Sequence, residues 1–392
     1  MLDALPEPVR ALLDTLLRAG HEAVLVGGCV RDHARGAPVH DWDVASSAAP
    51  EQVLALFPRA VPIGLRFGTV MVPTASGPVD VTRFRGPTLH DDLARRDFTL
   101  NAMAWDPRTG AAVDPFGGLA DLRAGRLVAV GRAEERLAED PLRALRAARI
   151  VAELSLAVDP ALEAALPAQA AALAKLAPER VRSELERLLG APRPAAGLEL
   201  LRKSGLEAVL VPGARPDAIA VIAALPPDRT LRWAAWLRDT AAPAILARWR
   251  VPRVRRQHVE GLLALHPAER FLAEGDAGAR RLRRRAGDEA QLARLLALRE
   301  AECAAGALPD ADAVRGRLAA LRERLARTEA QAVARAELAL AGTDVMACLG
   351  IGPGPRVGAA LRFLLERVLE DPAENTPERL RAALRAWAER SP

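Results

Sequence analysis

The chain has 392 residues, of which 50% are hydrophobic and 27% are charged, and its formal net charge is +5. This composition is too apolar and too nearly charge-balanced for a disordered chain, and no apolar run approaches the roughly 20 residues needed to cross a bilayer. The start of the chain lacks an export signal, and the three cysteines show no paired spacing. We therefore expect a cytoplasmic protein with no membrane partner and no evident obligate protein partner.

Arginine dominates the basic residues, because only Lys175 and Lys203 are lysines and the other 53 of the 55 are arginine. Guanidinium groups suit bidentate contacts with phosphate, so nucleic acid is a reasonable partner.

The chain changes character near residue 135, where β-branched runs and glycine turns give way to segments rich in Ala, Leu, Arg and Glu. Before that point, apolar spacing predicts a helix over 8–19 and a strand over 23–26. Further strands are predicted over 42–45, 69–73, 79–84 and 127–130. From Pro141 onward the apolar spacing is helical. We predict an α+β fold, with a mixed sheet and helices first and an all-helical arm after it.

Two glycines, Gly27 and Gly28, follow the first predicted strand and precede a predicted helix. Glycines at such a turn let backbone N–H groups approach a phosphate closely. Arg31 lies one helical turn further on and could hold a triphosphate oxygen. An ordinary turn followed by a surface arginine would look the same.

Asp41 and Asp43 flank Trp42, so on a strand both carboxylates point to one face. Such a pair can ligate divalent metal, with Mg²⁺ preferred and Mn²⁺ as an alternative. Two-metal phosphoryl transfer needs carboxylates in this arrangement. Asp80 alternates with Val79 and Val81 and is a candidate third ligand, although a solvent-facing strand aspartate would show the same pattern.

Residues 92–102 read Asp-Leu-Ala-Arg-Arg-Asp-Phe-Thr-Leu-Asn-Ala. Within this segment Arg96 could bind phosphate, while Asp97 and Asn101 could hydrogen-bond a ribose hydroxyl. The alternative is a capped helix with a salt bridge. The segment closely resembles the Arg-Arg-Asp-Phe-Thr-Ile-Asn-Ala signature of class II tRNA nucleotidyltransferases and bacterial poly(A) polymerases. The resemblance implies a polymerase-β-like head.

A second stretch, Glu-Asp-Pro-Leu-Arg-Ala-Leu-Arg over 139–146, continues the resemblance. The family implies that Asp140 and Arg143 pair with the edge of the incoming base, and that Arg146 and Arg149 contact the nucleotide. Donor and acceptor counting permits this, because cytosine and adenine share the exocyclic amine that an aspartate accepts from. A surface ladder of ion pairs would have the same spacing.

The helical arm carries fewer signals. Residues 178–189 resemble the neck helix of the family, but their apolar spacing is explained by core packing and we assign them no chemistry. Basic residues further on are candidates for contacts with the phosphates of tRNA, namely Arg280, Arg281, Arg283, Arg284, Arg285 and, in a Gly/Pro-rich turn, Arg356. Each could instead lie on a solvated helix face.

The resemblance implies four parts, which we place at 1–138 for the catalytic head, 139–200 for a neck with the base-reading motif, 201–285 for a helical body and 286–392 for a tRNA-binding tail. The implied partners are the 3′ end and elbow of tRNA, CTP and, for the fuller reaction, ATP.

We expect metal-dependent addition of CMP to tRNA with release of pyrophosphate. A short connection favours CC addition over full CCA addition, because only residues 86–90 separate Arg85 from Asp91, where the family implies a longer loop in CCA-adding members. A poly(A) polymerase is a further alternative, but residues 63–70 resemble the tRNA enzymes. A non-catalytic RNA-binding protein remains a hypothesis from another class, and it accounts poorly for the pair of Asp41 and Asp43.

Overall fold

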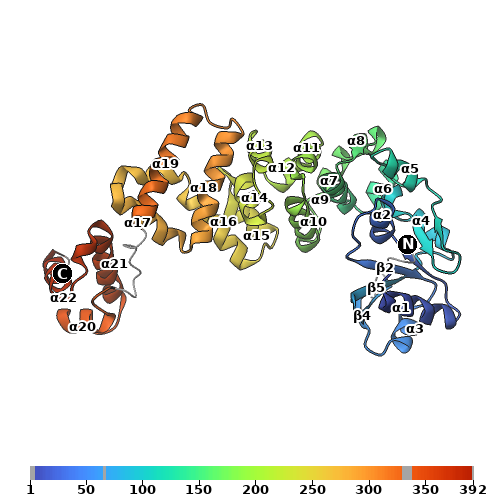
Figure 1. Ribbon diagram of the computed structural model, residues 1–392, viewed down its shortest axis with the longest axis horizontal. Helices are drawn as coiled ribbons and strands as arrows, with labels where there is room; N and C mark the ends of the chain where they lie inside the picture. The colour runs from blue at the N-terminus through green and yellow to red at the C-terminus, as the bar shows by residue number, and fades with distance from the viewer. Residues whose placement is uncertain (1–4, 65–67, 329–337, 391–392) are drawn as a thin grey trace. The chain divides into compact units, whose positions relative to one another are not determined.

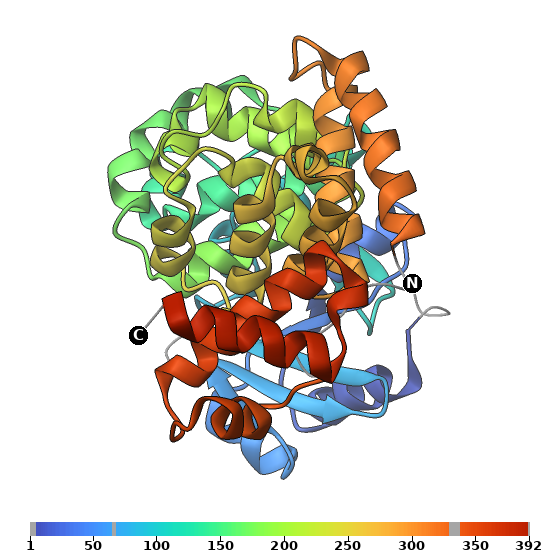
Figure 2. The same cartoon turned by 90° about the vertical axis from the view of Figure 1, so that its left-hand side faces the viewer.

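The computed structural model describes residues 5–64, 68–328 and 338–390. The chain divides into two compact units, Met1–Leu210 and Val211–Pro392, which Figures 1 and 2 show in two views. Every strand that the structure describes lies in the first unit. Among the described residues, no helix combines the length and the apolar character that a membrane span needs. The finer four-part division stays a prediction.

The first half of unit 1 alternates helices and short strands. Its elements in chain order are α1 (Glu7–Arg18), β1 (Ala23–Val26), α2 (Gly28–Ala34), β2 (Trp42–Ser46), α3 (Pro50–Leu56), β3 (Val61–Gly64), β4 (Thr69–Thr74), β5 (Gly77–Arg83), α4 (Leu89–Ala94), the 3₁₀ turn η3 (Thr99–Asn101), β6 (Ala104–Asp106), β7 (Ala111–Val113), α5 (Gly118–Arg123), β8 (Arg126–Leu127) and α6 (Ala133–Glu139).

Seven of these strands form one mixed sheet in the order β3-β4-β5-β2-β1-β6-β7. The pair β2 and β5 is parallel, and the other neighbours are antiparallel. The helix predicted over 8–19 and the strands predicted over 23–26, 42–45, 69–73 and 79–84 are confirmed to within a few residues.

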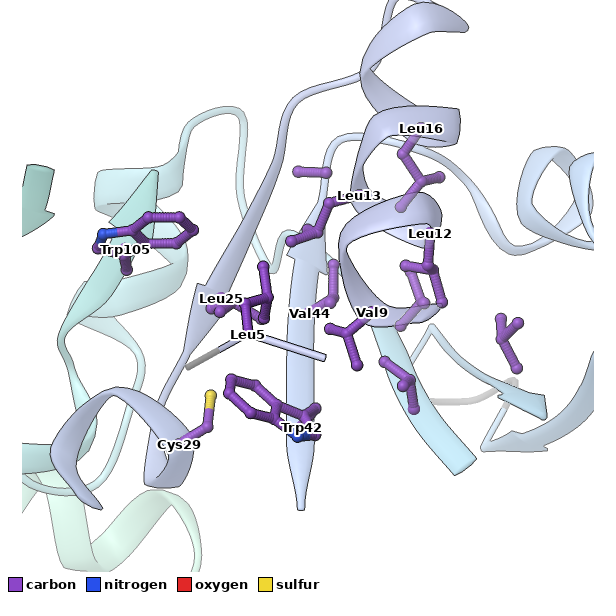
Figure 3. Close-up of a cluster of buried hydrophobic side chains, with 14 of the residues drawn as sticks. Leu5, Val9, Leu12, Leu13, Leu16, Leu25, Cys29, Trp42, Val44 and Trp105 are labelled. Carbon is purple, nitrogen blue, oxygen red and sulfur yellow. The ribbon is translucent and has the colours of Figure 1, made fainter. Parts of the chain in front are cut away.

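One face of this sheet is covered by α1. Apolar residues of α1 recur at helical spacing at Val9, Leu12, Leu13 and Leu16, all of them buried. They pack over strand residues of the same face, including Val44 of β2, as Figure 3 shows. Because side chains alternate along a strand, burying Val44 on this face sends its neighbour in the chain to the other face.

The strand predicted over 127–130 is the main local error. Only β8 (Arg126–Leu127) is a strand there, and it pairs in parallel with β9 (Ala157–Val158). The next residues bond to a loop instead: the Val128 carbonyl accepts from the Thr99 N–H, and the Val130 N–H donates to the Asp97 carbonyl. These two hydrogen bonds form a single antiparallel bridge between Phe98 and Ala129 in place of a longer strand.

The second half of unit 1 is helical. Its elements are α7 (Leu142–Leu154), β9, α8 (Pro160–Ala165), η4 (Pro167–Gln169), α9 (Ala170–Leu173), α10 (Pro178–Gly190), α11 (Pro194–Lys203) and α12 (Leu206–Leu210). Helix α7 packs against both α10 and α11. A Cβ at Gly197 would lie 2.3 Å from the carbonyl oxygen of Ala148, so only glycine allows α11 to approach α7 this closely.

Unit 2 is a set of packed helices. They are α13 (Ala218–Ala223), α14 (Arg229–Leu237), α15 (Ala242–Arg248), α16 (Arg253–Leu265), η5 (Ala268–Glu274), α17 (Gly275–Ala286), α18 (Glu289–Ala304), α19 (Ala311–Arg327), α20 (Gly342–Leu349), α21 (Pro355–Glu370), η8 (Pro372–Glu374) and α22 (Pro377–Arg390). The last three α-helices share their own apolar core, and Figure 2 draws them in red.

A buried carboxylate, Glu302 of α18, ties several helices of unit 2 together. It accepts hydrogen bonds from Arg238 and, at 2.8 Å, from Arg299. Its Oε2 also lies 2.9 Å from Nε2 of the His266 ring. Burial alone would raise the pKa of Glu302, but His266 and the two guanidinium groups outweigh burial and lower it to about 2.

We expect Glu302→Gln to lower the free energy of unfolding by about 3 kcal/mol at neutral pH, because it removes the buried negative charge that Arg238 and Arg299 share. The pKa of Glu302 falls from 4.5 to about 2 on folding, so its contribution is present above pH 4.5 and is lost as the pH falls towards 2. Urea unfolding followed by tryptophan fluorescence measures this. As a control, Glu300→Gln removes an exposed pair with Arg322 and should cost about 1 kcal/mol or less; equal losses in the two variants would contradict the account.

Candidate active site

Two carboxylates lie on the sheet face opposite α1, and a third, Asp41, lies just before β2. Asp43 of β2 stands in register with Asp80 of β5, and Asp41 lies two residues before Asp43. Burial raises the pKa of Asp43; the charge of Arg96 opposes this shift, and the charges of Asp80 and Asp41 add to it. Burial likewise raises the pKa of Asp80, again with Asp41 adding. The sheet therefore holds like charges together, which a bound cation would stabilise.

Gly27 and Gly28 form the turn between β1 and α2. Gly27 has a φ of +73°, which favours glycine, and a Cβ there would lie 3.0 Å from Nη1 of Arg96. Arg31 of α2 donates to Asn101 Oδ1 at 2.8 Å and makes two 3.0 Å bonds to the carboxylate of Asp32. The two predicted phosphate-binding segments thus lie side by side.

Arg96 is held in place by Asp92, which is almost fully buried and accepts from Arg96 Nη2 at 3.0 Å. Arg96 also donates to the backbone carbonyl of Asn101 at 3.4 Å. This region does not form the capped helix considered as an alternative, because α4 ends at Ala94.

Asp97 joins the head to α7. Its carboxylate accepts from Asn101 Nδ2 at 3.0 Å, from the Phe98 N–H at 2.9 Å and from Arg146 Nε at 2.6 Å. Burial would raise the pKa of Asp97, but Arg146 and these hydrogen bonds lower it to about 2. Asp97 is therefore a structural anion as well as a candidate ribose contact.

Asp140 lies two residues before α7, and Arg143 lies in the first turn of α7. Asp140 Oδ1 accepts from the Leu142 N–H at 3.2 Å and Oδ2 accepts from Arg180 of α10 at 2.6 Å. Arg143 donates to the carboxylate of Glu139 and to the carbonyls of Arg136 and Arg95, at 2.8, 2.8 and 3.0 Å. The predicted base-reading pair is thus held by protein groups on several sides.

Two arginines near this pair, Arg149 and Arg180, make contacts that the sequence did not predict. Arg149 is 4% exposed and donates to Glu184 and Glu153, both at 2.7 Å, so its guanidinium braces α7 against α10. Its contact with the nucleotide stays a prediction. Residues 178–189 were assigned no chemistry, yet Arg180 contacts Asp140. The apolar spacing of that helix concealed this role; the only available signal was that Arg180 lies within a segment resembling the family's neck helix.

These residues line one open cleft of about 1870 Å³. Ordinary small-ligand sites have roughly 300–1,000 Å³, so this cleft has room for a nucleotide and for the end of another chain. Its lining includes Gly27, Gly28, Arg31, Asp41, Asp43, Arg96, Asp97, Asn101, Asp140, Arg143, Arg146 and Arg149. Asp80 lies in the sheet beside Asp43 but is not part of that lining.

The donors present suit magnesium. In the described parts of the chain, no group of three or more His, Cys, Asp or Glu side chains gathers at metal-ligand spacing, so Asp80 does not complete a three-carboxylate cage with Asp41 and Asp43. Mg²⁺ is usually held by one or two carboxylates together with substrate phosphates and waters. The pair of Asp41 and Asp43 fits that pattern.

The predicted RNA contacts in unit 2 divide into two groups. Arg280 is 5% exposed and donates to the carbonyls of Leu369 and Glu370. Arg281 pairs with glutamates of α21 and η5, and Arg283 with Glu289. These three arginines hold helices together, and their contacts with tRNA phosphates stay a prediction.

The other three candidates lie at the surface of unit 2. Arg284, Arg285 and Arg356 are exposed, and Arg285 lies over the ring of Phe271 at 5.9 Å. They remain predicted tRNA contacts.

The sheet carries a carboxylate pair beside a glycine turn, and arginines of α7 line the same cleft. This combination defines a polymerase-β-like nucleotidyltransferase. Comparison with protein families agrees. "Poly A polymerase head domain" matches residues 23–128, "Probable RNA and SrmB- binding site of polymerase A" matches 155–217, and "tRNA nucleotidyltransferase domain 2 putative" matches 228–384.

Individual relatives narrow the class. A CCA-adding enzyme of Geobacillus stearothermophilus is 34% identical over 398 residues, covering 95% of each chain. A CC-adding tRNA nucleotidyltransferase of Shouchella clausii is 39% identical over 251 residues, covering 62% of this chain and 66% of the relative. The crystal structure of the Bacillus stearothermophilus CCA-adding enzyme in complex with CTP aligns with a TM-score of 0.78 and 32% identity over 98% of this chain and 99% of that one. The chain belongs to the family of CCA-adding and CC-adding tRNA nucleotidyltransferases, and it is a nucleotidyltransferase.

The geometry of the glycine turn can be tested with Gly27→Ala. The substitution strains a backbone with positive φ and pushes a methyl group against Arg96, so we expect the KM for the nucleotide to rise about tenfold or more, in keeping with the loss of ~1.4 kcal/mol of binding. Gly20→Ala is the matched control, because Gly20 has a φ of +84° with no atom within 4 Å of an added Cβ. If both variants lose stability and both keep their KM, the turn does not cradle the nucleotide.

Proposed function

We propose that the protein adds two CMP residues to the 3′ end of tRNA, using CTP and releasing pyrophosphate. The observation that carries this proposal is the placement of Asp41 and Asp43 beside the Gly27 turn, in a cleft whose lining also includes Asp140 and Arg143. A bound CTP in a relative of 32% identity supports the choice of nucleotide. The three cysteines are free, as expected for the reducing cytoplasm in which we propose that the protein acts.

In this reaction the 3′ oxygen of the RNA forms a bond to the α-phosphorus of CTP. The bond from that phosphorus to the β-phosphate oxygen breaks, pyrophosphate leaves, and the hydroxyl proton is released to solvent. Asp41 and Asp43 would hold magnesium, which neutralises developing charge and activates the attacking hydroxyl. Arg31 and Arg96, each fixed by a neighbouring carboxylate, would orient the triphosphate.

The protein itself would act as the template. Of the five N–H donors of Arg143, three are used by Glu139, Arg136 and Arg95. The other two N–H groups of Arg143 could donate to the ring nitrogen and the carbonyl of cytosine. Asp140 would accept from the exocyclic amine, which uracil and guanine lack at that position.

Preference for CC over CCA rests on the short connection before α4. Thr88 caps α4 in a reciprocal arrangement with Asp91, with bonds of 3.1 and 3.2 Å, and the Arg85 N–H donates to Asp92 at 3.2 Å. A connection fastened at both ends has little freedom to move the base-reading pair towards a purine. The alternative is complete CCA addition with ATP as a second substrate, and a poly(A) polymerase is a third candidate.

The sequence contrast with poly(A) polymerases depends on residues 63–70, of which Leu65, Arg66 and Phe67 lie outside the described residues.

For unit 2 we propose that Arg284, Arg285 and Arg356 contact tRNA phosphates near the elbow. Backbone contacts of this kind are sequence-independent and weaken as salt concentration rises.

Removing a metal ligand tests the catalytic assignment. Asp41→Asn and Asp43→Asn keep the side-chain shape but remove a charge, so single-turnover incorporation of CMP should fall by orders of magnitude while tRNA affinity changes little. Asp106→Asn is the control, because Asp106 pairs with Arg108 at the end of β6 and lies outside the cleft lining. A near-normal rate in Asp41→Asn would contradict the assignment.

Selectivity tests the template. Loss of one partner of a polar recognition pair typically costs about 1 to 3 kcal/mol, so discrimination against UTP and GTP should collapse in Asp140→Ala and Arg143→Ala. Competition assays with mixed nucleotides measure the ratio of kcat/KM values. Arg132→Ala, which alters an exposed pair with Glu135, should leave the ratio unchanged. A lower rate with intact selectivity in both cleft variants would refute base reading by this pair.

The end point of synthesis tests the CC assignment. With tRNA lacking its 3′ end, CTP and ATP together should give a product two nucleotides longer and no third addition, as resolved on a sequencing gel. With tRNA already ending in CC, ATP should not be used, because the fixed connection after Arg85 keeps the pair set for a pyrimidine. Efficient extension by one A would establish CCA addition instead.

A further inference from the structure

The cleft extends beyond the residues that the incoming nucleotide would use. Its lining also includes Gly68, Thr69, Thr82 and Arg83, at the side of the sheet formed by β4 and β5. In the proposed function, the incoming nucleotide binds to the glycine turn, the carboxylates and the start of α7. This second part of the cleft is therefore available to the other reactant, the RNA end that is extended.

Thr82 lies on the same sheet face as Asp80, because it is two residues further along β5. Its partner across the antiparallel pair is Thr69 of β4. Val81, between Asp80 and Thr82, points to the opposite face and is buried in the core under α1. The two threonines thus form the next row of side chains beside the carboxylates, roughly 7 Å along the strand.

The two hydroxyl groups are bonded to each other, with Oγ1 of Thr69 and Oγ1 of Thr82 3.0 Å apart. Two hydroxyls carry two protons, and this bond uses one of them. Among the described residues neither hydroxyl has another side-chain partner, and both side chains are half-buried. The pair therefore offers one donor and several lone pairs to the cleft.

A site with both a donor and acceptors, and no charge of its own, matches another hydroxyl better than it matches a phosphate. On an RNA end, the hydroxyl next to the reacting 3′ oxygen is the 2′-hydroxyl of the same ribose, which also distinguishes RNA from DNA. We propose that Thr69 and Thr82 bind the 2′-hydroxyl of the terminal ribose of the RNA acceptor and so position its 3′-hydroxyl at the carboxylates. This inference rests on the proposed function.

Two tRNA acceptors that differ only at the last residue test the proposal, one with a terminal ribose and one with a terminal 2′-deoxyribose that keeps its 3′-hydroxyl. We expect the wild-type protein to extend the ribose acceptor with a kcat/KM about five- to tenfold higher, the effect of one or two hydrogen bonds. In Thr82→Val and Thr69→Val this ratio should fall to about one, through slower extension of the ribose acceptor alone. Thr82→Ser should restore the preference.

The deoxy acceptor serves as an internal check on folding, because its rate and the KM for CTP should be unchanged in the valine variants. Thr15→Val, on α1, removes a hydroxyl that bonds to the Ala11 carbonyl outside the cleft and should keep the wild-type ratio. A preserved preference in Thr82→Val, or equal losses on both acceptors, would overturn the proposal. Failure of the wild-type protein to extend either acceptor would instead refute the proposed function, and this inference with it.

Discussion

The ion pair between Asp97 and Arg146 is the interaction on which the geometry of the site depends. The sheet supplies the carboxylates, α7 and the residue Asp140 before it supply the proposed base-reading pair, and the 2.6 Å contact joins the sheet side to α7. Its strength follows from burial: Asp97 is 6% exposed, so water competes poorly with Arg146, Asn101 and the Phe98 N–H for its oxygens. A carboxylate in such a site stays charged at pH values well below the usual pKa of aspartate, as its pKa of about 2 indicates.

The helix at the other end of this pair is itself braced. Arg149 connects α7 to Glu184 of α10, and Gly197 lets α11 lie against α7 without a side chain between them. Arg180 reaches from α10 to Asp140. The start of α7 is thereby fixed from the sheet and from two helices. The proposed template role requires this rigidity, since a displaced donor or acceptor would read a different base.

Much of the fold and of the candidate site could be predicted from local sequence. The predictions that were wrong or incomplete have physical causes. Alternation of polar and apolar residues predicted that Asp41 and Asp43 share one face and that Asp80 points away from Val79 and Val81. The register that sets Asp43 beside Asp80 comes only from the pairing of β2 with β5. Sequence could not show that the segment after Leu127 bonds to a loop, or that Arg280 is buried against Leu369, because both depend on residues distant in the chain. Arg149 matched a family motif, yet its environment, rather than its spacing, decides what it contacts.

A double-mutant cycle on Asp97 and Arg146 tests most directly the claim that their contact sets the site. Single-turnover rates of CMP incorporation would be measured for the wild type, Asp97→Ala, Arg146→Ala and the double variant at saturating CTP. The account predicts strong coupling, about 1 to 3 kcal/mol, so that the double variant is hardly slower than the slower single variant. Losses that add would show that the two residues act independently, and would contradict the account.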